Sequence, residues 1–184
     1  MFSKSYQITK EMYKARGWQI IKEDELTILA KVNSRVNTNP EFAIAKFIET
    51  TQEIKSPPLS QIIDFSSNEY VCVTIICDGS ITTNVKKIEQ TTKGKVEIFH
   101  NKDLQMNITK YHLQPLFNKL LDEEAKDFKK KYIKCKIENG KKIILQSFPS
   151  MSKSDPIARF FKYQSGDVIK ITNKDGFVSY RIVK

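Results

Sequence analysis

The amino-acid sequence predicts an α+β protein made of two domains. Over residues 70–100, a strand-like apolar run, a helical pattern and a second strand-like run follow one another, as in an α/β layer. Towards the C-terminus, a short helical pattern precedes strand-like segments joined by turn residues. A length of 184 residues with a hydrophobic fraction of 40% suits one medium domain or two small ones. We therefore expect an N-terminal α/β domain over residues 1–100 and a small, mixed α/β C-terminal domain over residues 101–184.

The N-terminal domain is expected to begin with a helix over residues 3–16. Ile8, Met12 and Ala15 recur at the spacing of one helix face, and Gly17 follows at a position that suits a helix C-cap. The next segment, "WQII", is compatible with a short apolar strand or with a buried turn.

A second helix is expected in the middle of this domain. Residues 23–36 fit either a helix or a pair of strands. The following stretch, "NTNPEFAIAKFIETTQEI", has the features of a helix start, because Asn39 can cap it and Pro40 occupies its first position. A loop follows at 55–60. The expected apolar face of this helix comprises Phe42, Ile44, Ala45 and Ile48.

The end of the N-terminal domain carries the α/β layer. The near-continuous apolar run at 70–76 suits a strand that is buried on both faces, and Asp78 and Gly79 close it with turn residues. The segment "TNVKKIEQTTKG" predicts a helix that ends before Gly94. The next segment, "KVEIFH" at 95–100, alternates like a strand.

The C-terminal domain is expected to open with an edge strand or an extended arm over residues 104–115, ending at Pro115. A surface helix follows over residues 120–132, because acidic residues fill its first turn and lysines its last, as the helix dipole favours. The segment "IKCKIENGKKIILQ" predicts a hairpin that turns at Asn139 and Gly140. The expected apolar stripe of the helix comprises Leu121, Ala125, Phe128 and Tyr132.

The end of the chain predicts a short helix and a final hairpin. Asp155 can cap the helix, Pro156 takes its first position, and Gly166 breaks it. The segments "DVIKIT" and "FVSYRIV" then pair through "NKDG". The residues expected to face inward from this helix are Ile157, Phe160 and Phe161.

A formal net charge of +10 favours acidic partners, namely nucleic acid, an anionic surface or an acidic protein. Lysine dominates over arginine, and lysine lacks the planar fork that reads guanine or grips phosphate through two bonds. We therefore expect non-specific electrostatic binding, with an ordinary solvated lysine surface as the competing interpretation.

Three cysteines without a CxxC pair indicate free thiols rather than a disulfide framework or a zinc site. No stretch approaches the roughly 20 apolar residues that a membrane helix needs. The first residues carry charges where a signal peptide has its apolar region. We therefore expect an intracellular protein that does not contact a membrane.

Sequence patterns for catalysis are missing. His100 and His112 are the only histidines, and neither lies in the setting of a nucleophile. Glu53-Ile54-Lys55 spells the E-x-K half of a metal-dependent nuclease signature, but an acidic partner on a neighbouring strand is not evident. Neither a phosphate-binding glycine loop nor a paired-carboxylate motif occurs. The residues thus favour a binding or assembly protein with no catalytic residue, no metal site and no cofactor of its own.

Four motifs of the C-terminal half carry a family resemblance. They are "NITKYHLQP" at 107–115, "DPIARFF" at 155–161, "GDVIKI" at 166–171 and "YRIV" at 180–183. Together they resemble the assembly domain of the fifth subunit shared by eukaryotic RNA polymerases I, II and III, and its archaeal equivalent. The residues that this resemblance implies for subunit assembly are Asp155, Pro156, Arg159, Gly166, Lys170, Tyr180 and Arg181.

The N-terminal half resembles the same family. The segment "KEMYKARGWQI" at 10–20 is similar to the first helix of the eukaryotic jaw domain, which the archaeal equivalent lacks. The resemblance implies that this jaw is a nuclease-like α/β layer without a catalytic motif. The segment "SITTNVKKI" at 80–88 aligns with the family's I-T-P-S-A-x-K segment near downstream DNA. A lysine pair there can serve the phosphate backbone. The residues implied to lie near the duplex are Thr82, Thr83, Asn84, Lys86 and Lys87.

The sequence also departs from the family pattern. Tyr111 and Phe117 stand where the family has two histidines, and a hairpin around Asn139 and Gly140 is inserted. Enrichment in lysine, isoleucine and asparagine indicates an AT-rich genome. We expect a large nucleocytoplasmic DNA virus as the source, with a reduced parasitic eukaryote as the alternative. The protein would lie in the virion and in the viral factory or host cytoplasm if viral, and in the nucleus if cellular.

The resemblance implies a non-catalytic subunit of a multisubunit DNA-directed RNA polymerase. It implies that the C-terminal domain docks on the largest subunit and that the jaw lies near downstream double-stranded DNA. It assigns the catalytic magnesium ions to the large subunits. Two alternatives stay open: a free-standing basic nucleic-acid-binding protein, favoured by charge, and a degenerate nuclease, favoured by the α/β pattern with Glu53 and Lys55.

Overall fold

The computed structural model forms two compact units, Met1–Asn107 and Ile108–Lys184, which are described one at a time. The division falls at 107/108 rather than at 100/101. The 3₁₀ turn η1 (Asn101–Leu104) packs against helix α1 of the first unit, where Leu104 is buried. The structure describes residues 2–32, 41–49, 69–92, 94–133, 135–138, 141–144 and 148–184; at 84, 135–138 and 141–144 it describes the backbone only.

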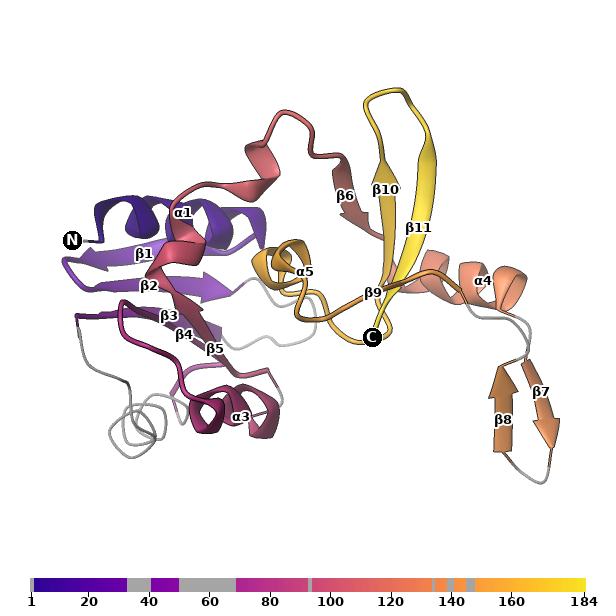
Figure 1. Ribbon diagram of the computed structural model, residues 1–184, viewed down its shortest axis with the longest axis horizontal. Coiled ribbons are helices and arrows are strands. Elements are labelled where there is room, and N and C mark those ends of the chain that lie inside the picture. The colour runs from indigo at the N-terminus through magenta and orange to yellow at the C-terminus, as the bar shows by residue number, and fades with distance from the viewer. Residues whose placement is uncertain are drawn as a thin grey trace. The chain divides into compact units, whose positions relative to one another are not determined.

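A mixed five-stranded sheet forms the centre of the first unit, in the order β1-β2-β3-β4-β5. The first three strands pair antiparallel, and β3, β4 and β5 pair parallel. Helix α1 covers one face of the sheet and α3 the other (Figure 1). The strands are β1 (Gln19–Asp24), β2 (Thr27–Val32), β3 (Glu41–Ile48), β4 (Cys72–Cys77) and β5 (Val96–His100); the helices are α1 (Ser3–Ala15) and α3 (Thr83–Thr91).

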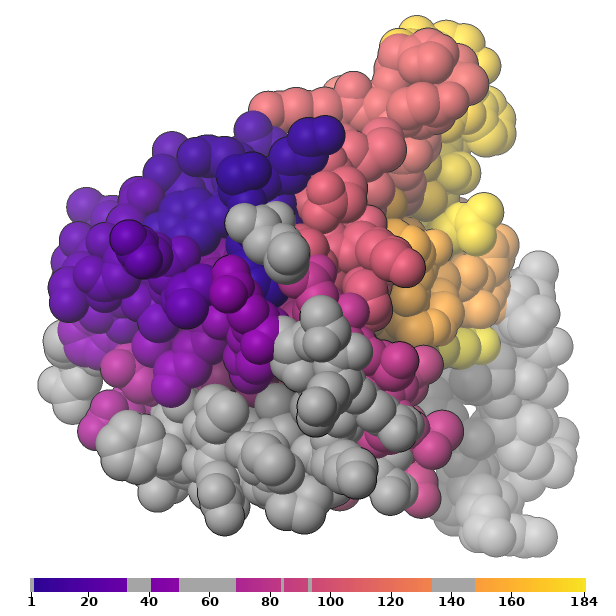
Figure 2. All heavy atoms as spheres, turned by 60° about the vertical axis from the view of Figure 1, so that its left-hand side comes forward, coloured from indigo at the N-terminus to yellow at the C-terminus, as the bar shows by residue number. Residues whose placement is uncertain are grey.

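Helix α1 confirms the predicted first helix, and Gly17 follows it with a φ of 77°. The predicted apolar face is wrong in part, because Met12 is buried but Ala15 is exposed. The buried face includes Ser5 and Thr9, whose hydroxyls donate to the carbonyl oxygens of Phe2 (3.0 Å) and Ser5 (2.7 Å). Hydroxyls that are satisfied within the helix can be buried, so polarity alone misplaced this face. In the space-filling view, α1 (indigo) lies along one side of the unit (Figure 2).

The second predicted helix is wrong over its described part, because residues Glu41–Ile48 form strand β3. Ala43, Ala45 and Phe47 lie on the α1 face of the sheet and are buried. β3 hydrogen-bonds to β2 on one side and to β4 on the other, so its tertiary partners override the helix propensity of its alanines. The proposed capping residues, Asn39 and Pro40, lie outside the described residues.

The remaining elements of this unit follow the predictions more closely. Residues 19–32 form a hairpin of β1 and β2, so the strand alternative holds there and the helix alternative is wrong; 33–36 lie outside the described residues. Strand β4 is buried along its whole length, as its apolar run predicts. Helix α3 and strand β5 are confirmed. One core lies between this sheet and α3, formed by Ile44, Val73, Ile75, Cys77, Val85, Val96 and Ile98.

A four-stranded sheet with the order β6-β10-β11-β9 forms the second unit, and a separate hairpin, β7-β8, accompanies it. Helix α4 packs on one face of this sheet, where its Ala125 joins Val168 and Ile182 of the sheet in one core. Helix α5 packs on the other face, where its Ile157 joins residues of the sheet such as Ile169. The elements are β6 (Leu116–Lys119), α4 (Asp122–Tyr132), β7 (Cys135–Glu138), β8 (Lys141–Ile144), β9 (Ser150–Met151), α5 (Pro156–Phe161), β10 (Val168–Thr172) and β11 (Val178–Val183).

Helix α4, the hairpin β7-β8 and the final hairpin β10-β11 are confirmed; the turn at Asn139 and Gly140 lies outside the described residues. Of the two alternatives for 104–115, an edge strand or an extended arm, the edge strand is wrong. That segment contains the 3₁₀ turns η1 and η2 (Ile108–Lys110), and the edge strand β6 starts after Pro115. Proline cannot donate to a sheet, so the strand begins just beyond it.

Two details of the C-terminal helices also differ from expectation. Helix α5 ends at Phe161, where Lys162 adopts a left-handed conformation with φ of 58°, and Gly166 therefore does not end it. The α4 stripe is wrong at both ends, because Leu121 is 55% and Tyr132 47% exposed. Within the helix, Ala125 is buried and Phe128 is partly buried against the sheet.

Candidate functional site

The segment expected near DNA forms the start of helix α3. The Thr82 side-chain oxygen accepts a hydrogen bond from the Val85 backbone N–H at 3.3 Å and so caps the helix. The Lys86 N–H donates to the Thr82 carbonyl oxygen at 3.1 Å. Val85 is fully buried against the sheet and anchors this first turn.

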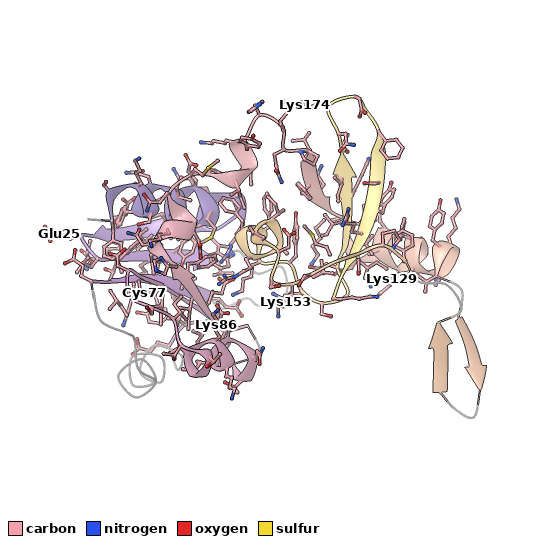
Figure 3. The ribbon with its side chains drawn as sticks, in the orientation of Figure 1. Glu25, Cys77, Lys86, Lys129, Lys153 and Lys174 are labelled. Atoms are coloured by element: carbon pink, nitrogen blue, oxygen red, sulfur yellow. The ribbon has the colours of Figure 1, made fainter. Side chains whose placement is uncertain are left out.

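The outer side of this helix start is basic. Thr83, Lys86 and Lys87 are exposed, and the first turn holds no acidic side chain. Lys86 lies on α3 in Figure 3. Two lysines beside the positive end of a helix favour a negatively charged ligand such as phosphate. The structure thus brings Thr82, Thr83, Lys86 and Lys87 onto one helix start, where the backbone of Asn84 also lies.

Two side-chain contacts, neither of which was predicted, hold α3 and the loop that leads to it. Asp78, just after β4, accepts a hydrogen bond from the Asn101 side-chain amide, just after β5. Glu89 on α3 accepts a hydrogen bond from the Ile98 backbone N–H at 2.5 Å, on the outer edge of β5. Their signal in the sequence is weak, because each contact joins residues from different elements, and nothing distinguishes Asp78, Glu89 and Asn101 from other polar residues of the chain. Both contacts fix the loop and helix that present the lysines.

A buried polar network lies on the α1 face of the same sheet. The Arg16 guanidinium donates to both carboxylate oxygens of Glu97, at 2.6 and 3.2 Å. The Tyr13 hydroxyl donates to Thr74 Oγ1 at 3.0 Å, and Cys72 Sγ contacts Glu97 at 3.5 Å. Burial raises the pKa of Tyr13 well above its usual value, so this hydroxyl stays a neutral donor. The network joins α1 to β4 and β5 and is structural.

The predicted assembly residues divide by role. Asp155 Oδ1 accepts from the Ile157 N–H at 2.8 Å, and Gly166, with φ of 91°, donates its N–H to the Val183 carbonyl at 2.8 Å. Both residues therefore support the fold itself. Exposed Pro156 occupies the first turn of α5, and Arg159 is half-buried.

The remaining assembly residues lie on the sheet. Lys170 stands opposite Tyr180 on β11 and Asn118 on β6. The ring of half-buried Tyr180 lies 4.7 Å from that of Phe128. Arg181 is exposed and reaches the Ser150 carbonyl at 3.5 Å. Only exposed side chains such as that of Arg181 are free to contact a partner.

Within the described part of the chain, no three His, Cys, Asp or Glu side chains come together as a metal site would require. His100 Nδ1 accepts from the Lys102 N–H at 3.1 Å, and the ring of His112 lies 4.7 Å from that of Tyr111. Glu53 and Lys55 lie outside the described residues. None of the described helices is long and apolar enough to span a membrane.

A hollow of about 310 Å³ lies elsewhere on the first unit, between the start of α1 and the β1–β2 turn. Phe2, Tyr6 and Leu26 give it an apolar wall, and Glu25 and Glu49 add two carboxylates. Carboxylates repel phosphate, so the start of α3 is the better candidate for contact with a nucleic acid.

Comparison with known proteins identifies the family of this chain. Residues 106–183 match the family model described as RNA polymerase Rpb5, C-terminal domain. The chain is 98% identical, over the whole length of both proteins, to a protein of Invertebrate iridescent virus 6 that carries the provisional name DNA-directed RNA polymerase subunit 454R. It is also 26% identical, over 95% of its length and 86% of the relative's, to subunit 5B of DNA-directed RNA polymerases IV and V of Arabidopsis thaliana.

A second Arabidopsis relative, subunit 5A of DNA-directed RNA polymerase V, is 30% identical over 67% of this chain and 54% of its own length. The chain therefore belongs to the Rpb5 family of DNA-directed RNA polymerase subunits. The predicted resemblance and the expected similarity to a viral polymerase subunit are both confirmed.

Proposed function

We propose that this chain acts in transcription without catalysing it, as a subunit that joins the polymerase through one domain and meets DNA with the other. Its C-terminal domain docks on the largest subunit. Its N-terminal jaw lies beside the downstream duplex. The chain holds no cofactor, and the catalytic magnesium ions belong to the large subunits. In an infected cell it would work in the viral factory or cytoplasm and travel in the virion.

One observation supports the DNA contact most strongly, namely the pair of exposed lysines on the capped start of α3. Phosphate contacts release counterions, so each lysine that contacts the backbone makes binding more sensitive to salt. A lysine that only decorates the surface contributes little at physiological salt, where the Debye length is about 8 Å.

The test compares two double variants within the assembled polymerase on a downstream duplex. Lys86→Ala with Lys87→Ala is expected to lower the slope of log K against log salt by about 2, because about 0.9 is lost for each phosphate contact. The matched control is Lys4→Ala with Lys14→Ala, which removes the same charge from the exposed side of α1. Equal slopes for both double variants would refute the DNA contact at α3.

A net charge of +10 also favours the alternative of a free-standing nucleic-acid binder. The isolated chain distinguishes the two functions. A polymerase subunit should bind duplex DNA weakly by itself and remain with the large subunits at high salt. Tight binding by the isolated chain, together with loss from the polymerase at high salt, would favour the free binder.

A further inference from the structure

The backbone hydrogen bonds of β11 alternate between two sides of the strand. Odd-numbered residues face β10, as the bonds from Asn173 N to Phe177 O and from Val183 N to Asp167 O show, both at 2.9 Å. Even-numbered residues face away from β10. Ile182 N donates in that direction to the Pro149 carbonyl at 3.0 Å.

The short strand β9 covers only the end of this outer edge. It pairs Ser150 with Ile182 and Met151 with Val183. Val178 and Tyr180 face the same side as Ile182, and no described residue bonds to their backbone N–H or C=O groups there. As far as the described residues go, half of the outer edge of β11 is therefore open, and β9 shows that this edge accepts a parallel strand.

The opposite edge of the sheet is protected. On β6, Phe117 and Lys119 face outwards, since Leu120 N donates to the Val168 carbonyl on β10 at 2.9 Å. The Tyr163 hydroxyl donates to the outward carbonyl of Phe117 at 3.3 Å. Lys119 adds a charge to this edge, paired with Asp167 at 2.8 Å. Side-chain caps and lysines are common means of blocking strand addition, and the open half of β11 has neither.

Apolar side chains surround the open edge. Leu116 and Val178 flank Thr172 in one cross-strand row and are 67% and 37% exposed, and neighbouring Phe177 is 64% exposed. The segment Phe177–Tyr180 carries no charge. Lys174 marks the tip of this hairpin and Lys129 marks α4, with the open stretch of β11 above α4 (Figure 3). Exposed apolar residues beside unpaired backbone groups indicate a binding edge.

We propose that Phe177–Tyr180 of β11 accepts an extended strand from another subunit of the polymerase. This inference rests on the proposed function and names its contact. The added strand would exchange backbone hydrogen bonds with Val178 and Tyr180. Its side chains next to Val178 would be uncharged and apolar, and they would extend the row formed by Leu116, Thr172 and Val178. A second copy of this chain fits less well, because two chains of net charge +10 repel each other.

Val178→Pro tests the proposal in the full chain. Proline removes the N–H of Val178, which points to the open edge and is not used by β10, and the first position of a strand tolerates proline. The variant should lose about tenfold or more in affinity for the remaining polymerase subunits, without loss of thermal stability. The control Val178→Thr keeps the backbone donor and the shape of the side chain, and it should bind as the wild type does.

Amide exchange gives a second measurement that needs no variant. In the isolated chain, the amides of Val178 and Tyr180 should exchange quickly and those of Ser179 and Arg181 slowly. In the assembled polymerase, the first two should slow by about tenfold or more. Mass spectrometry with electron-transfer fragmentation separates single amides. Fast exchange of Val178 and Tyr180 in an intact polymerase would overturn the proposal.

The results of these experiments distinguish failure of the β11 contact from failure of the proposed function as a polymerase subunit. Wild-type chain that fails to join the polymerase would refute the proposed function itself. Polymerase that retains Val178→Pro at full affinity would refute only the β11 contact. A dimer of the isolated chain that Val178→Pro dissolves would assign the edge to a second copy and overturn the proposal.

Discussion

Replacing Glu97 with alanine is expected to destabilise the N-terminal unit by about 3 to 5 kcal/mol, as removal of one partner of a buried ion pair does. The Arg16 side chain is only 2% exposed, and its guanidinium has two hydrogen bonds to Glu97. Burial by itself lowers the pKa of Arg16, but the charge and hydrogen bonds of Glu97, together with Cys72 and Tyr13, raise it overall. Without Glu97, a guanidinium that cannot lose its proton stays buried without its carboxylate.

A double variant without either charge shows whether the ion pair or the side-chain volume matters. Arg16→Met alone leaves Glu97, which is 13% exposed, and should cost less than Glu97→Ala. The double variant Arg16→Met with Glu97→Leu removes both charges and keeps the volume, so its stability should lie within about 1 kcal/mol of the wild type.

Urea unfolding followed by tryptophan fluorescence measures these free energies. Trp18 is the single tryptophan of the chain, and its ring lies 5.1 Å from the Arg16 guanidinium carbon and 4.9 Å from the Tyr13 ring. Its emission therefore reports the unfolding of the first unit. A loss below about 1 kcal/mol for Glu97→Ala would show that water reaches the guanidinium, which would refute the reasoning.

Three further predictions concern single positions. Burial raises the pKa of the Cys77 thiol from 9.0 to about 11, so alkylation mapped by mass spectrometry at pH 8 should spare Cys77 in the native chain. The native state should also lose stability as the pH rises from about 9 to about 11, because the unfolded thiol ionises first; the control Cys77→Ala should lose less stability over the same pH range. Asp155→Ala should cost about 0.5 to 2 kcal/mol in thermal unfolding by loss of the α5 cap, whereas Asp155→Asn keeps most of it; equal losses would contradict this. Gly166→Ala should cost about 1 to 2 kcal/mol, because Gly166 has a φ of 91°; an unchanged melting temperature would count against the left-handed conformation.

Much of the fold could be predicted where local chemistry decides the structure. Asp155 and Pro156 begin α5, Gly17 follows α1, and acids and lysines at its two ends mark α4. Each signal acts within one turn of helix, so neighbouring residues are sufficient to read it. The family motifs at 107–183 likewise lie in the sequence itself.

Tertiary contacts decided the rest. The alanines, glutamate and lysine of Glu41–Ile48 suit a helix by propensity, but the segment forms β3 because strands on both sides supply hydrogen bonds. The same holds for the candidate sites. The family motifs contain Asp155 and Tyr180 without showing that they support the fold, and the sequence contains Val178 without showing that its backbone groups lie on an open strand edge. Burial and pairing depend on which distant segments meet, and no single stretch of sequence holds that information.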